Sequence, residues 1–545
     1  MPGKMPWKMA AGAAAIVLLA SGCSGSSSDD AEALPNSISI GIVEPTSLIP
    51  SNVVETGGSQ VLASLYYPLV RFNDKSTPYA VAAQSITHDK ANRVWTIRLK
   101  PGFTFSNGEP VTADNYINAW NYGAYGPNGQ LASYFYSRIQ GFADLQSEDP
   151  DGKDGPAQAP EPKARTMSGL KKVNNTTFTV TLSAGFAGWE SVMGYTAFYP
   201  LPKAAWESEG VLKKDFAEAP IGNGPFKIKG KWQHDQQIQV EKVADFKGTI
   251  PKVNAINWKI YQDLSTQYND LVAGNLDVET QIPVESLSQA SSDLGDRLLK
   301  SPSSGFDFVG FPLYDEKFKN PQVRRAISMA INREEMTEQI FLGSETAATA
   351  FVSPVLQGAR RNTCGPNCEY NPIKARQMYT AAGGPAEIKI TYNADGGHKP
   401  WIDAMCNQIK SSLGVNCVGT TVPKLTDLLA KVRAREDVGL YRLAWSMDYP
   451  LMENYLGPLY TSDGSSNYGA YKSTAFDTLV RQGSEAPTVE QATKYWQKAE
   501  DILAKDVPVL PLRFSQNVFG HSDRVTDVTM DLFAMVDIYK IDIAS

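Results

Sequence analysis

The chain has 545 residues, of which 42% are hydrophobic and 10% aromatic, and its formal net charge is −7 at pH 7. This composition supplies enough apolar material for packed cores and excludes a disordered chain, while the acidic balance argues against a nucleic acid as partner. A single core stops growing near about 250–300 residues, so the length predicts two or three domains.

The first 22 residues have the pattern of a secretory signal peptide. Lys4 and Lys8 precede an apolar run over 9–20, and small residues follow up to Cys23. The run is too short to span a bilayer, which needs roughly 20 apolar residues. Removing residues 1–22 takes away two lysines and no acids, which leaves 49 basic against 58 acidic residues. No later segment is apolar enough to span, so we expect the rest to be soluble.

Residues 19–23 (LASGC) resemble the lipobox of bacterial lipoproteins, although Ala20 stands where that family usually has Leu. The resemblance implies that Cys23 becomes the first mature residue and carries acyl chains such as palmitate. Residues 23–33, rich in Ser, Gly, Asp and Glu, would then form a flexible tether. The alternative is an ordinary signal peptide that happens to be followed by a Cys.

Hydrophobic periodicity predicts a series of strands and helices along the chain. In the first half, we expect strands over 37–43, 94–99, 177–182 and 225–228, and helices over 59–66 and from Thr112, with that Thr as N-cap. In the second half, we expect helices over 321–331, 401–413, 424–434 and 488–505, and strands over 387–392, 415–420 and 441–447. The polar, Pro-rich stretch 147–166 predicts a loop. Strands alternating with helices favour the α/β class.

Four cysteines follow Cys23, namely Cys364, Cys368, Cys406 and Cys417. In an oxidising compartment an even number predicts two disulfides. Pairing of neighbours, Cys364 with Cys368 and Cys406 with Cys417, is our preference among the three connectivities. A zinc site with four thiolates is the rival, but the C-x3-C and C-x10-C spacings do not match the usual C-x2-C pairs.

The known catalytic motifs are missing from the sequence. The four histidines are not at metal-ligand spacing, and neither a G-x-S-x-G elbow nor a P-loop is present. One S-x-x-K tetrapeptide starts at Ser168, without the partner motifs that would give it meaning. Carboxylates are plentiful and do not single out an acid and a base. We therefore expect a protein that is not an enzyme and that uses no cofactor and no metal.

Several stretches, in this order and spacing, resemble the large extracytoplasmic solute-binding proteins of dipeptide and oligopeptide ABC importers. They are RVWTIRLKPGFTFSNGEPVTADNYINAW (93–120), PIGNGPFKIK (220–229), NPQVRRAISMAINRE (320–334), ITYNADGGHK (390–399), YRLAWSMDYPLMENYL (441–456) and NYGAYKSTAFDTLV (467–480). The resemblance covers nearly the whole mature chain. It implies a bilobed α/β fold of the periplasmic-binding-protein type (type II, large peptide-binding class) with an extra inserted α/β domain.

The same resemblance implies a domain plan and a function. The first lobe would comprise 34–66, 199–300 and 515–545, the inserted domain 67–198, and the second lobe 301–514. The protein would be a monomeric receptor, lipid-anchored on the extracytoplasmic face of the cell membrane. It would capture short peptides and deliver them to the permease and ATPase subunits of an ABC importer.

A peptide ligand is a zwitterion, so a receptor that encloses it must neutralise an ammonium and a carboxylate. The resemblance implies that Asp448, in the pattern W-x-x-D-Y, grips the ammonium. Arg442, six residues earlier and up to ~20 Å away along an extended strand, suits the carboxylate because a guanidinium binds carboxylates bidentately. His398 matches a histidine that meets the carboxylate of longer ligands. The alternatives are a surface turn for Asp448, a surface ion pair for Arg442 and a solvent-exposed loop for His398.

Further ligand contacts follow from the same resemblance. Trp445 would stack on a ligand side chain, with core packing as the alternative. The main chain of Val54, Glu55 and Thr56 would pair with the peptide, and Tyr134 matches an aromatic residue that faces the hinge. The helix end near 340–341 lacks the Lys found in one branch of the family, so the preferred peptide length stays open.

Two other kinds of function remain as alternatives. The same fold serves receptors for haem, nickel chelates, opines and oligosaccharides. An envelope hydrolase such as a peptidase is the alternative from a different class, and the missing catalytic motifs speak against it.

Overall fold

Two β-sheets contain most of the strands. The computed structural model describes residues 36–147, 159–394 and 397–544. The larger sheet has 11 strands, in the order β10-β11-β12-β1-β13-β19-β14-β18-β16-β17, with β15 paired to β19. Their bounds are β1 (Ser37–Ile42), β10 (Phe226–Ile228), β11 (Gln237–Lys242), β12 (Ala255–Ile260), β13 (Val278–Glu279), β14 (Leu298–Gly310), β15 (Glu345–Ala347), β16 (Glu387–Asn393), β17 (Asn416–Val422), β18 (Leu440–Trp445) and β19 (Val509–His521). Parallel pairs such as β16–β17 and antiparallel pairs such as β14–β19 make this sheet mixed.

The smaller sheet is antiparallel and lies entirely within residues 67–198. Its order is β4-β5-β7-β6, with β4 (Ala83–His88), β5 (Val94–Leu99), β6 (Leu170–Asn174) and β7 (Thr177–Thr181). Short pairs complete the described strands: β2 (Val70–Phe72) with β3 (Pro78–Ala80), β8 (Trp206–Ser208) with β9 (Val211–Leu212), and β20 (Val525–Thr526) with β21 (Asp542–Ile543). This second sheet occupies the segment that the sequence assigns to an inserted domain.

Helices are interspersed with the strands along the chain. Their bounds are α1 (Thr56–Leu65), α2 (Ala113–Ala124), α3 (Trp189–Val192), α4 (Leu264–Val272), α5 (Leu287–Leu294), α6 (Glu316–Lys319), α7 (Pro321–Met329), α8 (Arg333–Gln339), α9 (Pro372–Ala381), α10 (Lys399–Leu413), α11 (Leu425–Arg433), α12 (Glu453–Tyr460), α13 (Thr474–Ser484) and α14 (Val489–Asp506). Thr112 precedes α2, as predicted, and its N–H donates to Asn115 Oδ1 at 2.7 Å. In the described ranges no helix is both long and apolar enough to cross a bilayer.

The predicted elements are confirmed, with small shifts at their ends. The helix α1 begins at Thr56, three residues before the predicted start, because the Glu55 side chain caps it by accepting from Gly58 N–H at 2.6 Å. The strand β18 ends at Trp445 rather than at Met447. The Met447 N–H donates to the side-chain oxygen Ser304 Oγ and not to a neighbouring strand's main chain. Of the predicted loop, residues 159–166 contain neither helix nor strand, and 148–158 lie outside the described residues.

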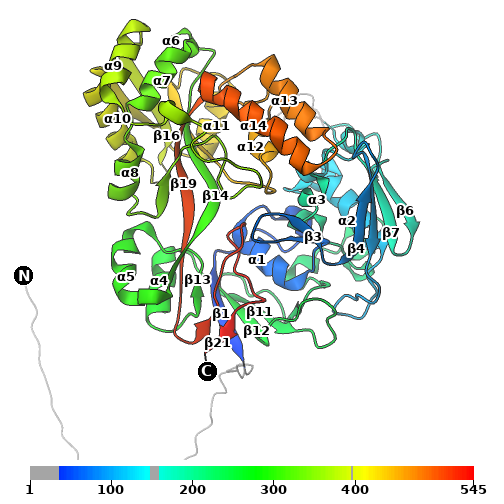
Figure 1. The fold of residues 1–545 in the computed structure, drawn as a ribbon. Coiled ribbons are helices and arrows are strands. Elements are labelled where there is room, and N and C mark those ends of the chain that lie inside the picture. The colour runs from blue at the N-terminus through cyan, green and yellow to red at the C-terminus, as the bar shows by residue number, and fades with distance from the viewer. Residues whose placement is uncertain (1–35, 148–158, 395–396, 545) are drawn as a thin grey trace, which may run out of the picture. The chain divides into compact units, whose positions relative to one another are not determined.

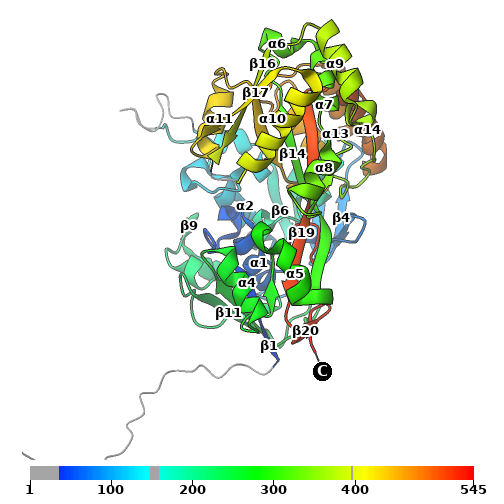
Figure 2. The same cartoon turned by 90° about the vertical axis from the view of Figure 1, so that its left-hand side faces the viewer.

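Two strands of 13 residues each, β14 and β19, run through the middle of the larger sheet. Figures 1 and 2 show them side by side, from the part that contains β13 and α4 to the part that contains β16 and α8. Their register shifts between Pro302 and Phe306, where three residues of β14 stand opposite Ser515 alone. Such a bulge bends a strand locally. Both predicted crossings between lobes, after residue 300 and before residue 515, fall inside these two strands.

The motif NPQVRRAISMAINRE owes its pattern to helix ends and buried arginines. Asn320 caps α7 by accepting from Gln322 N–H at 3.0 Å, and Pro321 takes the first helical position. Arg324 donates to the carbonyl oxygens of Phe318 and Val507. Arg333, which is buried like Arg324, donates to main-chain carbonyl oxygens and to a serine hydroxyl. These guanidiniums join α7 and α8 to neighbouring segments and are structural.

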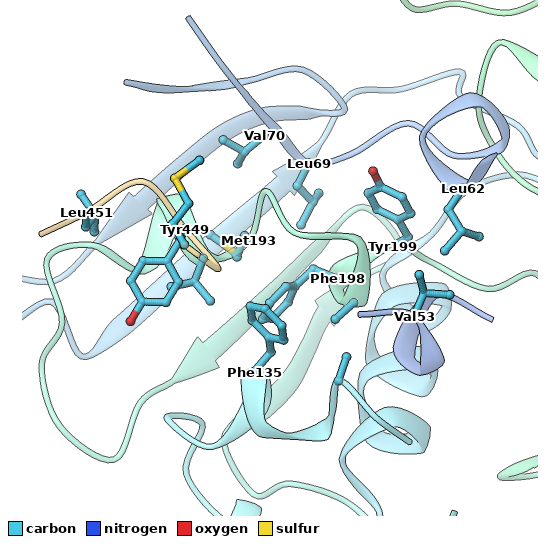
Figure 3. Close-up of a cluster of buried hydrophobic side chains, with 14 of the residues drawn as sticks. Val53, Leu62, Leu69, Val70, Phe135, Met193, Phe198, Tyr199, Tyr449 and Leu451 are labelled. Carbon is cyan, nitrogen blue, oxygen red and sulfur yellow. The ribbon is translucent and has the colours of Figure 1, made fainter. Parts of the chain in front are cut away.

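A large apolar core joins segments that are distant in the sequence. Figure 3 shows Phe135 and Phe198 in one cluster with Val53, and Tyr449 and Leu451 reach the same cluster from the loop after β18. All five side chains are buried. The loop that begins at the end of β18 is therefore packed against the segment 67–198 as well as against its own sheet.

Both expected disulfides are present. Cys364 pairs with Cys368, and Cys406 pairs with Cys417. The second bond joins α10 to β17, and the first closes a short loop before α9. The pairing of neighbours is confirmed, and with it the four thiols are used without a zinc ion. Cys23, the predicted lipid attachment site, lies outside the described residues.

Candidate ligand-binding site

Asp448 lies three residues beyond β18, in the loop that leads into α12. Its main-chain N–H donates to Asn454 Oδ1 at 2.8 Å, and its Oδ2 accepts from Asn454 Nδ2 at 3.1 Å. Its Oδ1 accepts from the Tyr134 hydroxyl at 3.0 Å. Because Asn454 is buried in the first turn of α12, this reciprocal pair fixes the direction of the Asp448 side chain.

The Asp448 carboxylate is partly buried and has only neutral donors. No Lys, Arg or His of the described residues forms an ion pair with it. The neighbouring acid Glu453 already pairs with Arg138 at 2.7 Å. Burial raises the pKa of Asp448, and the hydrogen bonds from Asn454 and Tyr134 offset part of that rise. A cationic ligand group at this carboxylate would compensate the burial of its charge.

Aromatic rings line the approach to Asp448. The Tyr134 ring stacks on Phe135 with centroids 4.5 Å apart, and Phe135 stacks on Tyr195 at 4.0 Å. Burial and the nearby Asp448 charge both raise the pKa of Tyr134 and of Tyr195. Tyr134 is still 47% exposed, and its hydroxyl contacts the carboxylate. Ring faces next to an anion suit an ammonium group. We call Asp448, Tyr134 and Tyr195 the acidic end.

The segment 54–56 lies close to this end. Val54 is 44% exposed in extended chain, and its main-chain N–H and C=O have no hydrogen bond within the described ranges. Glu55 and Thr56 begin α1, with Glu55 as the cap described above. Ser51 C=O accepts from Ala132 N–H at 3.0 Å, which places the segment next to the turn that carries Tyr134. Unpaired main-chain groups of this kind can bind an extended peptide in the manner of a strand.

Arg442 is in β18, between β14 and β16, and is not on a sheet edge. Its side chain is only 13% exposed, and its Nη2 lies 3.5 Å from Asp307 Oδ1. Its Nη1 donates to Asn393 Oδ1 at 3.4 Å. Arg442 therefore already has anionic and polar contacts inside the protein, and these partners differ from the Asn454 and Tyr134 side chains that contact Asp448.

A second arginine, which the sequence analysis did not single out, shares the same acid. Arg513 Nη2 donates to Asp307 Oδ1 at 2.8 Å, and its Nε lies 3.7 Å from Glu345 Oε2. The guanidinium carbon is 4.4 Å from the Phe341 ring centroid and 4.8 Å from that of Trp401. Burial raises the pKa of Glu345 to about 7, against the attraction of Arg513.

Strand register explains why these charges meet. Arg513 stands opposite Asp307 of β14 and Ala347 of β15, and Asp307 stands opposite Ala444 of β18. Side chains two residues apart in a strand point to the same face, so Arg442 and Glu345 join them there. We call these four residues, Asp307, Glu345, Arg442 and Arg513, the basic cluster. It lies towards the C-terminal ends of β16 and β18, the edge at which open α/β sheets bind ligands.

His398 and Trp445 take different positions relative to this cluster. His398 is buried just before α10, and Trp401 Nε1 donates to its Nδ1 at 3.3 Å. Since Trp401 covers Arg513, His398 lies one side chain away from the cluster. Trp445 stands opposite Phe306 and points to the other face of the sheet, where it is half-buried against the large core. The structure thus brings Asp448 and Tyr134 together, and it places Arg442 near the surroundings of His398. Trp445 and Arg442 point to opposite faces of the sheet.

The residues missed by the sequence analysis carried one recognisable pattern. Asp307 and Arg513 each interrupt an apolar strand, GFDFVGF (305–311) and VLPLRFS (509–515). Charged residues are almost never buried unless they are paired, so a charge in such a strand predicts a partner in a neighbouring one. Asn454, Tyr195 and Glu345 had no such pattern.

Comparison with known proteins gives the family. A family model described as "Bacterial extracellular solute-binding proteins, family 5 Middle" matches residues 77–467. The dipeptide-binding protein DppE of Bacillus subtilis is 25% identical over 519 residues, with 91% of this chain and 89% of DppE covered. The oligopeptide-binding protein OppA of the same organism is 23% identical, with 89% of each chain covered.

Solved structures agree on the fold. The unliganded open form of the periplasmic murein tripeptide binding protein MppA superposes with a TM-score of 0.79 at 22% identity, covering 93% of this chain and 97% of that one. The expected α/β fold of the bilobed, periplasmic-binding-protein type is thereby confirmed. The family model spans most of the chain, and the protein belongs to the bacterial extracellular solute-binding proteins of family 5.

Proposed function

We propose that the protein is a non-catalytic receptor that captures short peptides outside the cell membrane and delivers them to an ABC permease. The observation that carries this proposal is the Asp448 carboxylate, which is partly buried and has neutral donors as its only partners in the described part of the chain. A buried anion without a cation is costly, and the ammonium of a peptide supplies the missing charge.

The rest of the site fits a zwitterionic, extended ligand. The basic cluster stands apart from Asp448, so the two ends do not neutralise each other and can meet opposite ends of one molecule. The unpaired main chain at Val54 suits strand-like pairing with a peptide. The named relatives bind a dipeptide, an oligopeptide or a murein tripeptide, all of which carry ammonium and carboxylate groups.

The domain plan and the membrane anchor belong to the same proposal. The first lobe (34–66, 199–300 and 515–545) and the second lobe (301–514) would be joined by β14 and β19, and 67–198 would be the inserted domain. A lipid on Cys23 and a tether over 23–33 would keep the monomeric receptor at high local concentration beside its permease. Labelling with radioactive palmitate tests this part: the wild type should be labelled and Cys23→Ala should not.

The decisive experiment identifies the natural ligand. The protein is purified without added ligand, its bound molecules are extracted, and mass spectrometry identifies them. Short peptides are the expected result. A haem, a nickel chelate or an oligosaccharide in their place, with no peptides, would refute peptide capture while leaving the family intact. Conversion of added peptides into fragments by the pure protein would show an envelope hydrolase instead.

A further inference from the structure

Arg138 forms an ion pair between the segment 67–198 and the helix that follows Asp448. Its Nη2 donates to Glu453 Oε1 at 2.7 Å. Glu453 is the first residue of α12 and is only 4% exposed. Its second oxygen, Oε2, accepts from the Tyr449 hydroxyl at 2.6 Å. Both oxygens of this buried carboxylate therefore have donors, one from the segment 67–198 and one from the loop that carries Asp448.

Main-chain and aromatic contacts determine the position of Arg138. Its C=O accepts from Ser183 N–H at 2.9 Å, which fixes its main chain within the segment 67–198. Its guanidinium carbon is 4.1 Å from the Phe186 ring centroid. Phe186 in turn meets the Tyr449 ring edge-on, with centroids 6.2 Å apart. A guanidinium that lies over a ring keeps its edge available for a carboxylate, so this packing orients Arg138 towards Glu453.

This ion pair is close to the acidic end of the site. Tyr134, four residues before Arg138, donates to Asp448. Glu453, the partner of Arg138, follows Asp448 by five residues. Burial and, as a smaller cause, the charge of Glu453 raise the pKa of Asp448, so the two carboxylates are close enough to repel each other. A charge that acts on Asp448 acts equally on a cation bound to it.

Without Arg138, a cation at the acidic end would meet a second uncompensated carboxylate. In the described part of the chain, Arg138 is the only base that forms an ion pair with Glu453. Glu55 is a third acid near this end, where burial, Asp448 and Glu55 all raise the pKa of Tyr195. Its hydrogen bonds as the cap of α1 do not involve Arg138, so its charge stays the same whether or not Arg138 is present. The charge of Glu453 is thus the one that Arg138 controls.

We propose that Arg138 is a specificity-determining residue: by pairing with Glu453 it weakens the attraction of the acidic end for a second positive charge near the amino end of the ligand. This inference rests on the proposed function and adds a charge selectivity to it. The alternative is a purely structural ion pair that joins the segment 67–198 to α12, which would not distinguish ligands by charge. Because the Arg138 side chain is 35% exposed, solvent screens its charge, and the expected changes in affinity are several-fold.

Calorimetric titration of the purified full chain near neutral pH tests the proposal with two pairs of peptides. Lysyl-alanyl-alanine and norleucyl-alanyl-alanine differ by one ammonium near the amino end, and alanyl-alanyl-lysine and alanyl-alanyl-norleucine differ by the same ammonium at the other end. Arg138→Gln should raise the ratio of lysyl to norleucyl affinity in the first pair about fivefold, because Glu453 loses its partner. Glu453→Gln should lower that ratio about threefold or more, because the charge of Arg138 then lacks its acid.

The double variant Arg138→Gln/Glu453→Gln removes both charges and should return the ratio to within about twofold of the wild type. Arg360→Gln is the matched control, since Arg360 pairs with Glu500 and Asp501 instead, and it should leave the ratio unchanged. In every variant the ratio for the second pair of peptides should stay within about twofold of its wild-type value.

A structural role predicts a different result, namely equal losses of affinity for both peptides of the first pair. An unchanged ratio in the single variants, or a shift in the same direction in both, would therefore overturn the inference. If one single variant does not fold, the ratio in the other decides alone. Failure of the wild type to bind any of the four peptides would instead refute the proposed function, and the inference with it.

Discussion

The replacement Asp448→Asn tests the acidic end of the site most directly. The variant keeps the size of the side chain and its acceptor for the Tyr134 hydroxyl, and it removes the charge. Breaking a buried ion pair by removing one partner costs about 3–5 kcal/mol. Because each 1.4 kcal/mol is a factor of about ten, peptide affinity should fall at least 100-fold.

The same replacement should have little effect on the unliganded fold. The neutral amide removes the free-energy cost of burying a charge. Its NH₂ group, however, faces the donor Asn454 Nδ2, so the hydrogen bond at 3.1 Å is lost. These contributions oppose each other, and we expect the free energy of unfolding in urea to change by less than about 2 kcal/mol. A large loss of binding together with a small change in stability distinguishes a ligand contact from a structural residue.

The pH dependence of binding gives the Asp448→Asn test a second readout. Burial raises the pKa of Asp448 above its ordinary value, so peptide affinity of the wild type should weaken as pH falls through that raised pKa, while the ammonium stays charged. In Asp448→Asn this acid-side loss should be absent. Asp501→Asn, a change of one exposed acid paired with Arg360, is the control and should bind as the wild type does. Affinity of Asp448→Asn within threefold of the wild type in calorimetry would refute the assignment.

Three further predictions concern stability in urea unfolding. Tyr134→Phe removes the hydroxyl that donates to Asp448 and should lower the free energy of unfolding by about 1 kcal/mol, because the ring remains and only a partly exposed hydrogen bond is lost. Glu279 is fully buried and its pKa is raised from 4.5 to about 8, so stability should fall as pH rises from 4.5 to 8, and Glu279→Gln should recover up to about 3 kcal/mol at pH 7. Replacing Cys406 and Cys417 together by Ala opens a loop that spans 11 residues and should cost about 3 kcal/mol.

Each of these predictions has an outcome that would contradict it. For Tyr134→Phe, a loss above about 3 kcal/mol would mean that the hydroxyl supports more than this one contact. For Glu279→Gln, an advantage that persists unchanged at pH 4 would show that packing, and not burial of a charge, is responsible. For the cysteine pair, wild-type protein in excess reductant is the control, and equal stability of the wild type with and without reductant would contradict the stated contribution.

The sequence predicted most elements because their ends are determined locally. The start of α2 after Thr112, the start of α7 at Pro321 and the end of α10 at Gly414 each depend on residues within one helical turn. The long strands β14 and β19 were not predicted. Their 13-residue lengths depend on pairing with each other across about 200 residues of sequence, and no local pattern records that pairing.

The two ends of the candidate site differ in the same way. Asp448 was predicted because it lies in a short motif, and the residues that hold it, such as Asn454, are close in sequence. The basic cluster joins β14, β15, β18 and β19 through register, and only Arg442 of its members lay in a motif. The positions of Asp307 and Arg513 inside apolar strands predict that each charge is paired, but they do not identify the partner. Arg442 and Arg513 approach the same oxygen of Asp307 because the register of β14, β18 and β19 places all three on one face, and only the assembled sheet reveals that arrangement.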